Sequence, residues 1–141
     1  MPSDNTRDPM TEFFGAPIDV YTRADAIADG VLFEVPEKAW RKAGFRWPVA
    51  VTQAVHGQCV AWNGDEEMEA GRLHELLWMA YLAVAAEARR GNGGAESVPF
   101  LLVFHEVESP AVRQEVRLNI AMSRAGKDGA PVLTVMFPGE D

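Results

Sequence analysis

The stretch from residue 65 to residue 90 constrains the fold of this chain more than any other part of the sequence. It opens with four closely spaced acids, continues as a nearly uninterrupted apolar segment and closes on Arg89 and Arg90. Acids at the start and arginines at the end match the dipole of a helix, so we predict one long helix here. A helix with so little polar surface is expected to be enclosed by the rest of the fold. Its large apolar residues are then core residues: Leu73, Leu76, Leu77, Trp78, Tyr81 and Val84.

Length and composition indicate one ordinary soluble domain. The chain has 141 residues, of which 48% are hydrophobic and 24% charged, enough to bury a core without disulfides or metals. Its single cysteine, Cys59, excludes an intramolecular disulfide and suits a reducing compartment. No apolar run is long enough to span a membrane, and the first residues do not resemble a secretory signal. We therefore expect a cytoplasmic protein that does not contact membranes.

The N-terminal half favours short helices. Residues 1–12 are polar and read as a flexible tail, and residues 13–141 as a single domain. Thr22 is a suitable N-cap for a helix over residues 23–29, and residues 31–35 favour a short strand. A second helix is predicted from Pro36 and Glu37 to Ala43, ending at Gly44. A third is predicted over residues 49–62, because its apolar residues recur at helical spacing and Pro48 precedes it.

The C-terminal half favours strands. After a glycine-rich break at residues 91–94, residues 100–104 are apolar on both faces, which predicts an interior strand or one covered on both sides. Residues 116–123 alternate apolar and polar side chains, and residues 126–129 form a hairpin turn before a returning strand over 132–137. The predicted fold class is α+β: short N-terminal helices and one long central helix packed on a C-terminal antiparallel sheet of three to four strands.

Motifs that carry chemistry are scarce. The glycine-rich break follows a helix and precedes a strand, the reverse of a phosphate-binding loop, and lacks its lysine. His56 and Cys59 share one face of a predicted helix, but no second ligand pair accompanies them. Cys59 with His74 or His105 lacks the surroundings of a catalytic nucleophile. We therefore predict no catalytic residue, no metal site and no cofactor.

Charge is distributed unevenly over a chain whose net charge is −8. Residues 1–37 and 65–87 are strongly acidic, whereas residues 38–64 hold only bases: Lys38, Arg41, Lys42 and Arg46. These bases, here called the basic island, neighbour Trp40 and Trp47 and suggest phosphate clamping with base stacking. The alternative is that both tryptophans are core anchors and the bases are solvated. The overall negative charge favours the alternative, so direct nucleic-acid binding is not expected.

Four blocks of the sequence resemble a family of small uncharacterised proteins found on bacterial plasmids, phages and other mobile elements. They are residues 21–32 (Y-T-R-A-D-A-I-A-D-G-V-L), 43–52, 71–79 and 131–141, the last ending P-G-E-D. The similarity runs from about residue 18 to the C-terminus and weakens between about 94 and 128. The resemblance brings no established activity and no catalytic residues. It implies an accessory protein of a mobile genetic element.

The implied origin on a mobile element and the negative charge of the chain together lead to a functional hypothesis. A small acidic protein can occupy the basic groove through which a host defence complex holds nucleic acid, and so inhibit a CRISPR-type or restriction system. The expected partner is a protein with a basic surface, and the oligomeric state is left open. The partner-binding acids would be Asp65, Glu66, Glu67 and Glu69, with Asp25, Asp29, Glu140 and Asp141.

The rival hypothesis is a small enzyme or ligand-binding protein. It would use a pocket between the helices and the sheet, with four candidate residues at the mouth: Tyr21, Arg23, His56 and His105.

Overall fold

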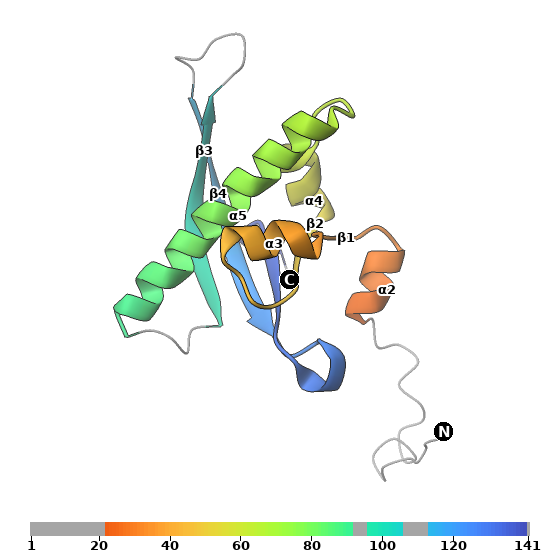
Figure 1. Cartoon of the computed structure of the whole chain (residues 1–141), viewed down its shortest axis with the longest axis vertical. Helices are drawn as coiled ribbons and strands as arrows, with labels where there is room; N and C mark the ends of the chain where they lie inside the picture. The colour runs from red at the N-terminus through yellow and green to blue at the C-terminus, as the bar shows by residue number, and fades with distance from the viewer. Residues whose placement is uncertain (1–21, 92–95, 106–112, 141) are drawn as a thin grey trace.

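The structure, a computed structural model, describes residues 22–91, 96–105 and 113–140 (Figure 1). The predicted tail over residues 1–12, Asp141 and most of the glycine-rich break lie outside these ranges. Within them, no helix is sufficiently long and apolar to cross a membrane.

Five strands form one mixed sheet in the order β1-β2-β5-β4-β3. Strand β5 lies parallel to β2, with Val51 beside Val135, and antiparallel to β4. The α+β class is confirmed, but the sheet is neither wholly antiparallel nor wholly C-terminal, because β1 and β2 come from the N-terminal half. The strands are β1 (Leu32–Glu34), β2 (Val49–Thr52), β3 (Ser97–His105), β4 (Arg113–Ser123) and β5 (Val132–Met136).

Strand β2 replaces the start of the helix predicted over residues 49–62. Three consecutive residues, Val49, Ala50 and Val51, are at most 1% exposed, since both faces of the sheet are covered here. Valines fit such a strand, and a continuous apolar run does not distinguish a covered strand from a buried helix. Helical structure begins only after Thr52, whose hydroxyl accepts from the N–H of Val55, and continues as α4 (Gln53–Val55) and the π-helix η1 (His56–Val60).

The other helices begin and end close to their predicted limits. They are α2 (Arg23–Ala28), α3 (Glu37–Ala43) and α5 (Glu66–Arg89). Thr22 and Asp25 form a reciprocal capping box at the start of α2. Asp65 caps α5 by accepting from the N–H of Met68. Gly44 ends α3 with a positive φ of 111°, as its predicted place after the helix requires.

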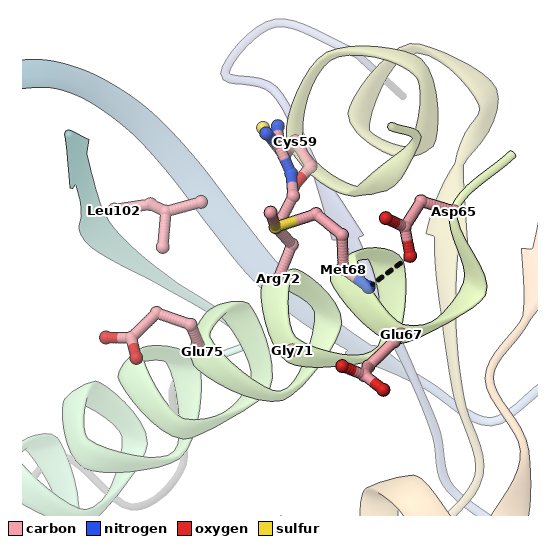
Figure 2. A pocket seen from close by; sticks show the side chains of 8 residues that line it. All are labelled: Cys59, Asp65, Glu67, Met68, Gly71, Arg72, Glu75 and Leu102. Carbon is pink, nitrogen blue, oxygen red and sulfur yellow. Dashed lines mark hydrogen bonds between the residues drawn. The ribbon is translucent and has the colours of Figure 1, made fainter. Parts of the chain in front are cut away.

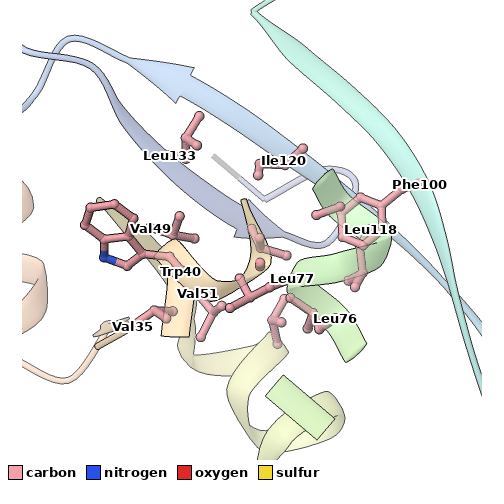
Figure 3. Packing of buried hydrophobic residues seen from close by; sticks show 14 of the residues in the cluster. Val35, Trp40, Val49, Val51, Leu76, Leu77, Phe100, Leu118, Ile120 and Leu133 are labelled. Atoms are coloured by element: carbon pink, nitrogen blue, oxygen red, sulfur yellow. The ribbon is translucent and has the colours of Figure 1, made fainter. Parts of the chain in front are cut away.

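Only one side of α5 is buried. Leu76, Leu77 and Ala80 are fully buried against the sheet and α3, within the core that Figure 3 shows. The opposite side faces solvent, where Trp78 is 42% and Leu82 40% exposed. The expectation that the fold encloses α5 is therefore wrong for this side, because the sheet and α3 cover a single face of the helix (Figure 1).

Strand β3 is an edge strand with one face partly exposed, so it is neither the interior strand nor the strand covered on both sides that its apolar sequence predicts. It pairs with β4, and in the described ranges no strand borders its other edge. Phe100 and Leu102 point into the core below α5, whereas Leu101 points to the other face and is 38% exposed. Although β3 carries apolar residues on both faces, only one of these faces is buried and the other is partly exposed.

Replacing Gly44 with alanine should destabilise the protein. The φ of Gly44 is unfavourable for other residues, and an added Cβ would lie 2.8 Å from Cε1 of Tyr81. We expect Gly44→Ala to lower the free energy of unfolding by about 2–4 kcal/mol, measured by urea denaturation. Gly57→Ala is the control, because a Cβ there meets no atom within 4 Å. Its effect should stay within about 1 kcal/mol, and equal losses in both variants would contradict the explanation.

Candidate functional site

Four of the predicted acids gather at the first turns of α5, and we call Asp65, Glu66, Glu67 and Glu69 the acidic end. Asp65 accepts from the N–H of Met68 at 3.1 Å (Figure 2), and Glu69 from the N–H of Trp62 at 2.8 Å. Glu66 and Glu67 are exposed and form no hydrogen bond or ion pair with the residues that the structure describes. Two carboxylates thus shape the end of the helix, and two are available to a partner.

The remaining predicted acids lie elsewhere. Asp25 and Asp29 belong to the end turns of α2, apart from α5 (Figure 1). Glu140 folds back and accepts from the hydroxyl of Thr52 at 3.0 Å and from the N–H of Phe137 at 2.7 Å. Asp141 lies outside the described residues. The structure therefore does not join the predicted acids into a single surface.

A hollow of about 380 Å³ adjoins the acidic end (Figure 2). Asp65 and Glu67 line it together with Glu75, which lies two helical turns beyond Glu67. Glu75 is not among the acids that we predicted for partner binding. The spacing of eight residues between the two glutamates could have revealed this, because it places them on neighbouring parts of one helix side. Met68 contributes partly exposed apolar surface, whereas Cys59 and Leu102 in the same wall are almost fully buried.

Arg72 lines the same hollow and offsets part of its negative charge. Its guanidinium donates to the carbonyl oxygens of Cys59 and Gln58, each at 3.1 Å, and lies 4.9 Å from the ring centre of Trp62. These contacts hold Arg72 against η1. Three carboxylates against one guanidinium leave the rim of the hollow negative.

A second hollow, of about 260 Å³, lies on the other flank of the acidic end, between β1 and α5. Glu66 and Glu69 line it, with Leu73 beneath them. The rings of Phe33 and His56 stack there at 4.1 Å between centroids. Hollows with carboxylates and apolar surface therefore flank the first turns of α5 on both sides.

The residues considered for metal binding do not form a ligand cluster. His56 stacks on Phe33, whereas Cys59 is buried, and burial raises the pKa of its thiol although the charge of Arg72 opposes the shift. Over the described part of the chain, no three histidine, cysteine or carboxylate side chains are close enough together to hold a metal ion.

The basic island forms an exposed patch on and after α3, and its tryptophans differ. Trp40 is 6% exposed and belongs to the core, as predicted. Trp47 is 47% exposed, so its prediction as a core anchor is wrong. Arg41 pairs with Glu37 and lies 4.9 Å from the ring centre of Trp40.

A larger cavity, about 670 Å³, lies between α2 and the face of the sheet turned away from α5. We call it the Arg23 cavity. Arg23 donates to the hydroxyl of Thr134 at 2.7 Å and to the carbonyl oxygen of Leu133 at 2.9 Å. Burial lowers the pKa of its guanidinium, and the negative charge of Glu34 opposes the shift. Glu140 lines the same cavity, so it holds both a cation and an anion.

The rival hypothesis placed four residues at one pocket mouth, and the structure separates those that it describes. Arg23 lines the Arg23 cavity, whereas His56 lines the hollow between β1 and α5. Tyr21 and the side chain of His105 lie outside the part of the chain that the structure describes.

Comparison with protein families gives a match over residues 10–141 to a family of unknown function, DUF6573. The chain belongs to this family. The resemblance to an uncharacterised family is thereby confirmed, while the family description carries no activity and no binding residues. Neither the curated proteins nor the solved structures contain a match.

Cys59 should be unreactive in the folded protein. It is 1% exposed and its raised pKa leaves less thiolate at a given pH, so alkylation by iodoacetamide at pH 8 should be at least about tenfold slower than in urea-unfolded protein. The rate is followed by mass spectrometry. Equal rates in folded and unfolded protein would show that Cys59 is accessible.

Proposed function

We propose that this protein is a non-enzymatic binding factor that recognises a basic protein surface through the acidic end of α5. The main support for this proposal is the position of Glu66 and Glu67. Both are exposed and form no ion pair with the described residues, and the two hollows beside them are lined by further carboxylates. An arginine or lysine of a partner could lay its aliphatic part against apolar surface and its charge beside a carboxylate.

The shape of α5 supports this proposal. Asp65 and Glu69 are engaged by backbone N–H groups, so the first turn of the helix is well defined before a partner arrives. The backbone that carries Glu66 and Glu67 is thereby fixed in advance, so binding would require ordering of these two side chains but not of the helix turn. Complementary charge would also speed the encounter and favour a basic partner over an acidic one.

The biological setting in this proposal comes from the resemblance to proteins of mobile elements. A protein of a plasmid or phage that covers a basic nucleic-acid groove would inhibit a host defence complex of the CRISPR or restriction type. A negative protein surface suits that role, because it repels nucleic acid itself while it competes for the same groove.

Charge reversal at the acidic end should abolish this activity while preserving the fold. The readout is transformation efficiency of a targeted plasmid in cells with an active restriction or CRISPR system, with and without the protein. Wild type should raise the efficiency, and Glu66→Lys combined with Glu67→Lys should lose the effect, since two attractions become repulsions.

The matched control is Glu96→Lys, which reverses an exposed acid that precedes β3 and follows the opposite end of α5 from the acidic end. It should protect the plasmid like wild type, and all variants should give the same circular dichroism spectrum. Protection that survives the double reversal, or absence of protection by wild type in every system tested, would refute the proposal.

The Arg23 cavity supports a second candidate, a ligand-binding protein. A cavity of about 670 Å³ that carries Arg23 and Glu140 is of the size that binds small molecules. Because its two charges are opposite, a ligand with both an acidic and a basic group would match them.

This candidate predicts a ligand-dependent rise in melting temperature. We would screen nucleotides, amino acids and divalent metal ions by thermal shift and repeat any response in Arg23→Gln. Saturating ligand at about a hundred times its Kd adds about 2.7 kcal/mol, which corresponds to several degrees for a domain of this size. A response equal in wild type and Arg23→Gln would place the ligand elsewhere, and no response would favour the protein-binding proposal.

A further inference from the structure

The exposed side of α5 carries residues at matching spacings before and after Trp78. Before Trp78, the residues on this side are Glu67, Gly71 and His74, all exposed. These residues lie within about 40° of Trp78 around the helix, at 100° per residue, and so form one stripe along the helix.

The residues after Trp78 lie at the same spacings as those before it, and the charges at the two ends are opposite. Leu82, Ala85 and Arg89 occupy the same stripe, at the spacings of His74, Gly71 and Glu67 in reverse order. Leu82 and Arg89 are exposed, and Ala85 is partly exposed. When two such helices lie antiparallel with Trp78 at the centre, an acid meets a base, a small residue meets a small residue, and His74 meets Leu82.

We infer that a second copy of this chain covers this side of α5, with the two helices antiparallel and the two-fold axis at Trp78. A two-fold contact uses the same surface on both subunits, and the opposite charges of Glu67 and Arg89 at equal spacings from Trp78 provide that self-complementarity. The recurrence of the stripe at intervals of three and four residues is also the spacing at which helices pack along a shared seam. The inference does not rest on the function proposed above. In the dimer the second copy engages Glu67, which leaves Glu66 of the acidic end to a basic partner.

Charge selects the antiparallel arrangement. In it, Glu67 of each copy lies beside Arg89 of the other, whereas parallel helices would place like charges together at both ends. The helix dipoles add to the same preference, because the positive start of one α5 lies beside the negative end of the other.

Trp78 is suited to be the central contact. Its ring stacks on Tyr81 at an interplanar angle of 14° and a centroid distance of 5.9 Å, and Tyr81 is held edge-on by Phe45 at 5.6 Å. Trp78 is thus partly ordered by its neighbours while it remains 42% exposed. Large aromatic residues held in place at the centre of an interface contribute most to affinity. The adjacent Leu82 extends the apolar surface.

The test is sedimentation equilibrium of the full chain over a wide concentration range. Wild type should be a dimer at high concentration, and Trp78→Glu should raise the dimer Kd by at least about thirtyfold. Trp47→Glu is the matched control, since Trp47 is similarly exposed but lies outside the stripe, and it should dimerise like wild type. A monomeric wild type, or a dimer insensitive to Trp78→Glu, overturns the inference.

A charge swap tests the arrangement of the two chains independently of the stability of either variant. Glu67→Arg or Arg89→Glu alone should weaken the dimer roughly tenfold, because the two-fold axis doubles each modest ion-pair effect. The double variant Glu67→Arg with Arg89→Glu should return to within about threefold of wild type, since each charge again meets its opposite. Additive weakening in the double variant would show that these two residues do not face each other and would overturn the antiparallel contact.

Discussion

The position of β5 between β2 and β4 is the constraint on which the rest of the structure depends. Its parallel pairing with β2 and its antiparallel pairing with β4 join the two halves of the chain into a single sheet. Val135, at the centre of this strand, is fully buried below α5. Without β5 the sheet would fall into two ribbons, and a two-stranded ribbon is barely stable by itself. The strand β3, against which α5 packs, belongs to the same sheet as β1 and β2 only through this insertion.

Local patterns predicted the helices well because their causes are local. Thr22, Gly44 and Asp65 act as caps through contacts within a few residues, and such contacts are visible in sequence. The hairpin of β4 and β5 follows likewise from alternation and a turn. The role of β2 could not be predicted in the same way, since Val49–Thr52 pairs with β1 on one edge and, on the other, with β5 from the other end of the chain.

The same distinction holds for the candidate site. The acidic end was visible as a cluster because its four members are neighbours in sequence on one helix. Glu140 and Arg23 acquired their surroundings through partners distant in sequence, Thr52 and Thr134, so charge alone could not show that they line a cavity. The exposure of Trp78 and Trp47 also required the fold, because an apolar sequence does not reveal which side of a helix or loop the remaining elements leave uncovered.

The order of the sheet has a kinetic consequence. Helix α5 and the pair of β3 and β4 consist of contacts between near neighbours, which form quickly. Pairing of Val51 with Val135 closes a long loop that contains α5, β3 and β4. Because the entropic cost of closing this loop is large, we expect the pairing to form late in folding. We therefore expect α5 and the β3–β4 pair to form before β5 pairs with β2 and β4. Until then the edges of β2 and β4 are unpaired and can pair with other chains.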